Sequence, residues 1–184
     1  MRRHWQKKPL LVRQAWPGVQ PPIARSALFD LASADGVESR LLSRFDGHWR
    51  LRHGPLARRA LPPLKRADWT LLVQGLDLHC QPAHDMLQRF RFVPEARLDD
   101  LMISYASDGG GVGPHLDSYD VFLLQVQGKR RWRIGQWPTA VGCQACRCAS
   151  WPTSSPPRTG CSNPATCSTC RRCGAMTAAL KVSA

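Results

Sequence analysis

The residues with the clearest chemical potential are His115 and Asp117, which follow a glycine-rich turn, Gly109–Pro114. The residues that come after them, Ser118–Gln125, include several β-forming side chains. Side chains two residues apart on a strand point to the same face, so an imidazole nitrogen and a carboxylate oxygen can converge on one point. Two of the three ligands of the two-His-one-carboxylate triad, which binds non-haem Fe(II) and leaves positions open, are thus present. A third ligand should be a His on a distant strand, but the sequence has no His after His115.

A second candidate metal site involves the cysteines, seven of which follow residue 140. Cys143-x-x-Cys146 and Cys167-x-x-Cys170 have a spacing at the edge of that of zinc ribbons, and four thiolates could close a tetrahedral site. Two observations argue against this interpretation. The other three cysteines, Cys148, Cys161 and Cys173, fit no pattern, and the segment lacks apolar positions that would pack a ribbon.

The chain changes in composition near Gly135. Residues 136–184 contain no Asp, Glu, His, Phe or Tyr, and all 13 acidic residues precede them. We therefore divide the chain into residues 1–135, with enough apolar side chains for a core, and a Cys-, Pro- and Ser-rich tail, residues 136–184, with no trustworthy helical or strand period. Such a composition is typical of a GC-rich gene read in a shifted frame, so we predict that the tail is out of frame and disordered.

The charge and the apolar pattern limit the class of protein. A net charge of +13 favours a polyanionic partner such as RNA or a ribosome, although the basic residues are scattered and form no single run. No apolar stretch approaches the ~20 residues of a transmembrane helix, and no signal-peptide core follows the basic N-terminus. We expect a cytoplasmic protein without a membrane contact.

Residues 1–135 are expected to form short strands and two helices. We expect strands at Pro9–Gln14, Trp69–Leu76, Leu101–Ala106 and Asp120–Gln127, and a last strand at Arg131–Ile134 after a turn at Gly128-Lys129. Asp46-Gly47 predicts a hairpin between Glu38–Phe45 and Trp49–Arg52. One helix should cover Ala27–Ala34 with Ser26 as its cap, and a second should run from Pro82 to about Phe92. The pattern predicts a mainly β fold with N-terminal α/β elements, in an antiparallel barrel or sandwich that is incomplete.

The motifs together resemble the bacterial JmjC-type ribosomal oxygenases, over about residues 4–135. The resemblance rests on the following segments: His4–Ala15, Asp46–Trp49, His53–Pro55, Leu98–Tyr105, Gly109–Gln125 and Gly128–Arg133. A lone His-x-Asp would be weak evidence, whereas this set in this order is specific. The resemblance implies an incomplete double-stranded β-helix of the cupin or JmjC type with an irregular C-terminal tail.

The resemblance also implies an activity and a site. It implies an Fe(II)- and 2-oxoglutarate-dependent dioxygenase that hydroxylates a large-subunit ribosomal protein, in the bacterial branch at C3 of an arginine. His115 and Asp117 match metal ligands of the family, and Ser104 and Arg130 match positions that hold 2-oxoglutarate. A guanidinium at position 130 suits this role because it can bind a carboxylate through two hydrogen bonds.

The sequence departs from the family after Gly135. The family continues with an acidic segment, a Pro-Gly-Asp turn, further strands with the distal iron-binding His, and a dimerisation region, none of which is found here. We therefore expect impaired iron binding. The family suggests a homodimer, but the region that forms it in the family is not found in this sequence. Two alternatives stay open: a non-catalytic basic protein that binds RNA or ribosomes and carries a four-cysteine zinc site, and a truncated product without function.

Overall fold

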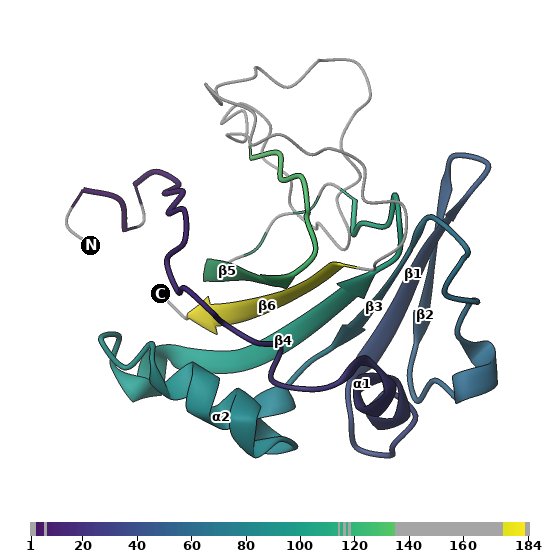
Figure 1. Ribbon diagram of the computed structural model, residues 1–184, viewed down its shortest axis with the longest axis horizontal. Coiled ribbons are helices and arrows are strands. Elements are labelled where there is room, and N and C mark those ends of the chain that lie inside the picture. Colours follow the sequence, from purple (N-terminus) through teal and green to yellow (C-terminus); the bar gives the residue numbers. More distant parts are fainter. Residues whose placement is uncertain are drawn as a thin grey trace, which may run out of the picture.

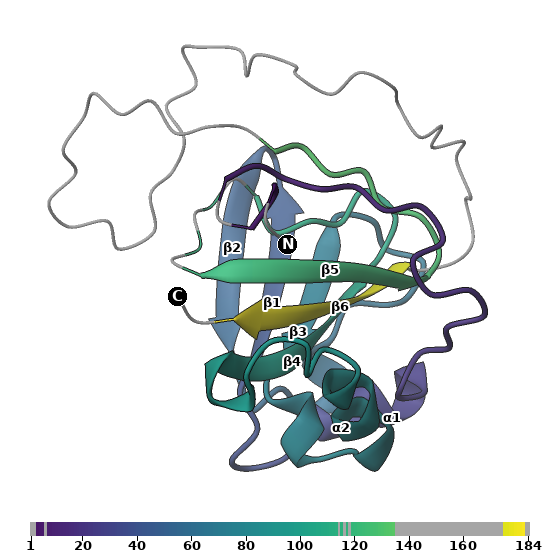
Figure 2. The ribbon, with the colours of Figure 1, turned by 90° about the vertical axis from the view of Figure 1, so that its left-hand side faces the viewer.

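The described residues form one antiparallel sheet of six strands in the order β2-β1-β3-β4-β6-β5 (Figure 1). The computed structural model describes residues 3–5, 7–113, 115, 117, 119–134 and 175–182, with only the backbone for residue 175 and residues 177–182. The strands are β1 (Ser39–Phe45), β2 (His48–His53), β3 (Trp69–Val73), β4 (Leu98–Ala106), β5 (Asp120–Gln127) and β6 (Ala175–Val182). The sheet coils strongly, so that β5 runs across the direction of β1 and β2 (Figure 2).

Two helices cover one face of this sheet. They are α1 (Arg25–Leu31) and α2 (Gln81–Gln88), and three short 3₁₀ turns, η1 (Arg58–Ala60), η2 (Leu76–Leu78) and η3 (Glu95–Arg97), join the larger elements. Both helices lie on the same side of the sheet, opposite β5 (Figure 1). Among the described residues, no helix is long enough and apolar enough to span a bilayer.

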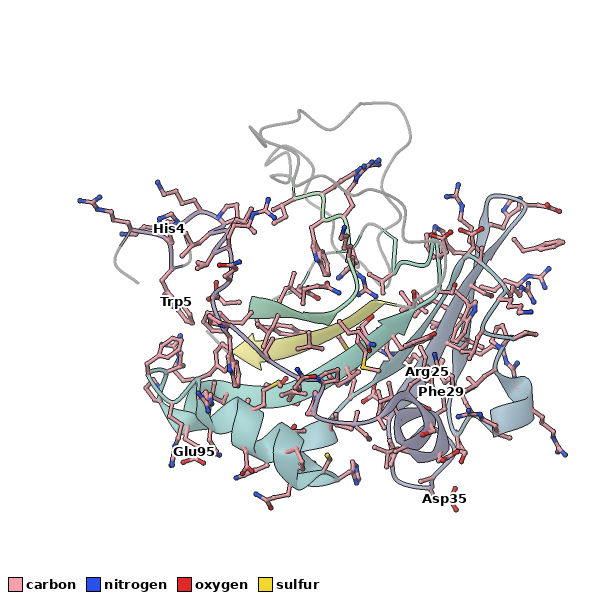
Figure 3. All side chains as sticks on the ribbon, in the orientation of Figure 1. His4, Trp5, Arg25, Phe29, Asp35 and Glu95 are labelled. Carbon is pink, nitrogen blue, oxygen red and sulfur yellow. The ribbon has the colours of Figure 1, made fainter. Side chains whose placement is uncertain are left out.

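The core lies between the helices and the central strands. Trp69 of β3 is fully buried, and its ring centroid is 6.0 Å from that of Phe29 on α1 and 5.4 Å from that of Tyr105 on β4. Figure 3 labels Phe29 on α1, and its ring meets Tyr105 edge-on at 5.0 Å. Aromatic pairs at these separations add to the free energy of area burial, so this trio stabilises the joint between α1 and the sheet.

Several expected elements are confirmed. The hairpin has Asp46 and Gly47 at its turn, with φ values of 46° and 79°, as a tight type I′ connection requires. The strand Asp120–Gln127 has the expected bounds. The helix after Cys80 begins at Gln81 with its proline in the first turn, as expected, but it ends at Gln88 and not near Phe92. The strand predicted at Leu101–Ala106 begins three residues earlier, at Leu98, and that predicted at Trp69–Leu76 ends at Val73 because the chain turns into η2.

Other expectations are wrong. Residues 9–14 form no strand, and Leu10, Leu11 and Val12 are 60%, 70% and 55% exposed, because no described strand pairs with this segment. Residues 131–134 are likewise not a strand. The first helix begins at Arg25, so Ser26 lies inside it and does not act as its cap.

The tail contributes a strand that the sequence pattern did not predict. Residues 175–182 form β6, which pairs with β4 on one side and with β5 on the other. The expectation of a tail without regular structure is therefore wrong for these residues. Backbone hydrogen bonding to two neighbouring strands needs no apolar alternation, which explains why the pattern gave no signal. Residues 136–174 lie outside the described part, and the out-of-frame origin of the tail stays a prediction.

Candidate active site

The candidate site lies on the face of the sheet that the helices leave uncovered. Residues directly opposite each other in an antiparallel sheet project to the same face. Ser104 of β4 is opposite Leu72 of β3, Leu72 is opposite Arg40 of β1, and Arg40 is opposite His53 of β2. These four side chains form one row across the sheet, and the neighbouring positions, such as Trp69 and Tyr105, face the helices.

His115 and Asp117 come together as the sequence predicted, but in a different backbone setting. His115 Nε2 lies 3.4 Å from Asp117 Oδ2, and the two side chains are 48% and 37% exposed. Neither residue is in a strand, because β5 begins only at Asp120. The expected strand geometry is therefore wrong, and the two groups converge from the loop that precedes β5.

The hydrogen bonding of His115 leaves the correct nitrogen for a metal. Nδ1 lies 3.0 Å from the carbonyl oxygen of Gly113, and because a carbonyl only accepts, Nδ1 must carry a proton and donate it. This contact directs Nε2 toward Asp117, in the arrangement that orients imidazoles in metal sites. Two ligand atoms at adjacent positions of one metal are separated by about 3 Å, given metal–ligand bonds near 2.1 Å, so the observed 3.4 Å needs only a small adjustment.

The electrostatics of His115 follow from its neighbours. The hydrogen bond to Asp117 is the largest influence and raises the pKa of His115, burial opposes it, and the Gly113 carbonyl and the charge of Asp117 raise the pKa further. The positive charge of Arg40 lowers it. A metal at this site would therefore have to displace a proton that Asp117 favours.

A glycine loop fixes the position of this pair. Ser107 Oγ accepts a hydrogen bond from the Trp69 amide at 3.1 Å, which ties the start of the loop to the core strand β3. At Gly110 a Cβ atom would lie 2.2 Å from the Trp69 carbonyl oxygen, so no other residue fits there without a shift of the backbone. Gly113 has a φ of 72° and lies against the indole of Trp49, within about 3.5 Å of where its Cβ would be.

A partly buried cation, Arg130, adjoins the site. Arg130 Nη1 donates a hydrogen bond to Ser104 Oγ at 2.9 Å, and burial lowers the pKa of Arg130 to about 10. Its Nη2 is buried without a hydrogen-bond partner, and no described carboxylate lies within ion-pair distance of this guanidinium. The guanidinium is partly buried and also lies 5.8 Å from the centroid of the Trp132 ring, but it has no carboxylate partner. This geometry fits a carboxylate from a ligand, which would bind the free Nη2 and accept from Ser104.

The described residues do not complete a metal site. Within them, no group of three or more His, Cys, Asp or Glu side chains could hold a metal ion. The four cysteines of the alternative zinc site, Cys143, Cys146, Cys167 and Cys170, lie outside the described residues. Trp49 and Arg40 also lie beside the site, and the sequence did not predict this. Their place depends on the register of β1 and β2, and the available signal was the hairpin pattern that contains both residues.

The chain is similar to a known family of domains and to two curated proteins. Residues 85–153 match the family model described as JmjC domain, a range that extends past Gly135. The chain is 43% identical over 136 residues to the ribosomal protein uL16 3-hydroxylase of Escherichia coli, which covers 74% of this chain and 36% of that protein. It is 38% identical over 138 residues to a probable ribosomal oxygenase of Haemophilus influenzae, covering 74% of this chain and 34% of that protein.

Solved structures show the same likeness. A crystal structure of Escherichia coli YcfD superposes with a TM-score of 0.81 at 31% identity, covering 100% of this chain and 51% of that one. A structure of the ribosomal oxygenase YcfD from the same organism, in complex with cobalt and 2-oxoglutarate, gives 0.73 at 32% identity, covering 99% and 46%. The chain thus spans between a third and a half of the length of these relatives.

Proposed function

Because this chain belongs to the JmjC-type ribosomal oxygenase family, with relatives that match about three quarters of its length, we propose that its site serves Fe(II)- and 2-oxoglutarate-dependent hydroxylation of a ribosomal protein. The observation that carries the proposal is the pairing of two half-sites on one face of the sheet. One is the His115–Asp117 pair with its 3.4 Å separation, and the other is the Ser104–Arg130 pair with a buried, unpartnered guanidinium nitrogen.

Each residue has a role that its contacts support. His115 offers Nε2 to iron because its Nδ1–H is held by Gly113, and Asp117 offers a carboxylate oxygen beside it. Arg130 and Ser104 bind the carboxylate of 2-oxoglutarate that lies farther from the metal. When bound, iron and 2-oxoglutarate supply the oxidising power that inserts one atom of O₂ into a C–H bond while 2-oxoglutarate loses CO₂ and becomes succinate.

The proposed substrate is the large-subunit ribosomal protein uL16, at C3 of an arginine. The name of the Escherichia coli relative supports uL16 as the substrate. The family resemblance of the sequence supports an arginine as the hydroxylated residue. The net charge of +13 supports an additional contact with RNA at the ribosome, and such a substrate would be met in the cytoplasm.

We propose further that residues 1–184 by themselves are impaired as an oxygenase. The sequence has no His after His115, and the described residues hold only two of the three ligands that the triad needs. Loss of a group that merely supports a metal ligand costs about 10–100-fold in affinity, so loss of a ligand should cost at least that. The carboxylate site formed by Ser104 and Arg130 does not depend on the missing ligand.

The test separates the two half-sites. The full chain is titrated with Co(II) by absorption spectroscopy and with 2-oxoglutarate by calorimetry, and an arginine-containing uL16 peptide is then assayed by mass spectrometry for the gain of one oxygen atom. We expect measurable 2-oxoglutarate binding, weak Co(II) binding that His115→Ala abolishes, and slow turnover. His84→Ala is the matched control, because His84 is exposed on α2 and its ring forms a hydrogen bond with Gln88 there.

Two results would contradict the proposal. Turnover or Co(II) binding that His115→Ala leaves unchanged would remove His115 and Asp117 from the site. Tight Co(II) binding by the unaltered chain would overturn the impairment and point to a third ligand outside the described residues.

A further inference from the structure

A basic groove lies on the face of the β1–β2 hairpin that points away from the glycine loop of the candidate site. It encloses about 730 Å³ between β1, β2 and the segment that follows η1. Residues Leu41, Ser43 and Phe45 of β1 are on one face with Arg50 and Arg52 of β2, because Leu41 is opposite Arg52 and Ser43 is opposite Arg50. Arg40 and Trp49, beside the candidate active site, belong to the other face.

The groove has a single sign of charge. Arg50, Arg52, Arg59 and Arg66 line it, and none of the described lining residues is acidic. All four arginines are exposed, and none forms an ion pair with a described residue. Guanidinium groups with free donors suit phosphate oxygens, which they bind through two parallel hydrogen bonds.

The groove also has an aromatic surface. Phe45, near the end of the hairpin, is 51% exposed, and the guanidinium of Arg50 lies 5.5 Å from its ring centroid. The hairpin projects beyond the rest of the sheet, so a long ligand could pass along it (Figure 1). A row of free cations beside an exposed aromatic ring is the combination by which proteins bind single-stranded nucleic acids, with phosphates on the cations and a base on the ring.

We propose that this groove binds single-stranded RNA, through phosphate contacts of the four arginines and base stacking on Phe45. An acidic peptide would satisfy the cations but would gain little from the exposed ring, so the ring favours RNA. The proposal locates the RNA contact that accompanies the proposed function, and it does not depend on hydroxylation because the groove and the metal-binding pair lie on opposite faces.

The test measures the affinity of the full chain for a fluorescein-labelled 12-nucleotide RNA of mixed sequence by fluorescence anisotropy, from low to moderate KCl. Each phosphate contact to a single strand contributes about −0.7 to the slope of log K against log salt. The double variant Arg50→Gln, Arg52→Gln should therefore reduce the slope by about 1.4 and weaken binding about 25-fold near 0.1 M salt. Phe45→Ala should weaken binding about fivefold or more without changing the slope.

Three controls keep the outcome interpretable. The double variant Arg13→Gln, Arg25→Gln removes the same charge at two exposed arginines outside the groove, and Figure 3 labels Arg25 on α1. It should change the affinity less than threefold. Arg50→Lys, Arg52→Lys should keep most of the slope, which excludes a folding defect, and His115→Ala should bind RNA normally even if hydroxylation fails.

Opposite results would overturn the proposal. Equal losses in the groove variant and in the control variant would show that the total charge alone attracts RNA. Binding of an oligoglutamate of the same length as tightly as RNA, with no effect of Phe45→Ala on either, would show that the groove accepts acidic chains in general.

Discussion

The two faces of the sheet are built in different ways. The helix-covered face is closed by large side chains that are fully buried, such as Trp69, Leu28 and Leu71. The other face carries half-exposed polar groups on loops, with His115 and Asp117 before β5 and Arg130 after it. Burial of apolar area on the helix-covered face stabilises the fold. The site face holds the cation of Arg130 without a carboxylate partner, so we expect it to contribute little to the stability of the fold.

The glycine loop on the site face is bonded to the core strand β3. Ser107 links the glycine loop to the backbone of Trp69, whose side chain is in the centre of the core. The amide of Asp68 also donates to the Asp108 carbonyl at 2.8 Å. The position of the His115–Asp117 pair therefore depends on strand β3, to which the glycine loop is bonded.

The largest expected effect comes from comparing two tryptophans, one on each face of the sheet. Trp69→Ala removes a fully buried indole that packs against Phe29 and Tyr105, so it should lower the free energy of unfolding by about 3–5 kcal/mol. Trp49→Ala, on the site face at 45% exposure, should cost about 1 kcal/mol or less. Urea denaturation followed by circular dichroism measures both, and similar losses would mean that the site face carries a core of its own.

The second prediction concerns the buried cation. Arg130→Met should weaken 2-oxoglutarate binding about 100-fold in calorimetry, because the ligand carboxylate loses a charged partner. The same change should leave the stability within about 1 kcal/mol or raise it, because a partly buried charge without a carboxylate partner is removed. A large loss of stability with normal 2-oxoglutarate binding would assign Arg130 to the fold and not to the site.

The third prediction tests the connection between the faces. Gly110→Ala places a Cβ at 2.2 Å from the Trp69 carbonyl, and forcing the backbone apart should cost about 1–3 kcal/mol and disturb metal binding. Gly111→Ala is the matched control, since its Cβ would meet only Trp49, at 3.9 Å. Thermal unfolding and Co(II) titration of the two variants should differ clearly, and equal behaviour would mean that the loop is not fixed by Trp69.

The smallest expected effect lies away from both faces. Arg91 and Glu95 form an exposed ion pair at 2.7 Å, with 58% and 63% of their side chains accessible. Exposed pairs of this kind contribute about 0–1 kcal/mol, so Arg91→Gln should change the stability by no more than that, and less in high salt. A larger loss would indicate that the segment between α2 and η3 depends on this pair more than its exposure suggests.

Several elements of the fold were predictable from the sequence. The Asp46-Gly47 turn, the strand Asp120–Gln127 and the proline-led start of α2 are local signals, because turn conformation and apolar spacing act over a few residues. The strand expected at residues 9–14 failed since a β-forming sequence becomes a strand only when a neighbour offers hydrogen bonds. Conversely, β6 forms without a predictive apolar pattern because β4 and β5 both offer hydrogen bonds to it.

The site was predictable in its members but not in its arrangement. The sequence by itself determined the ligand types, the glycine loop and the change of composition near Gly135, because these are properties of adjacent residues. Only the tertiary structure brought Arg130 to Ser104 across 26 positions, placed Trp49 against Gly113 and put the basic groove on the opposite face from the site. Such contacts depend on strand order and register, which are set by the packing of the whole sheet and not by any local segment.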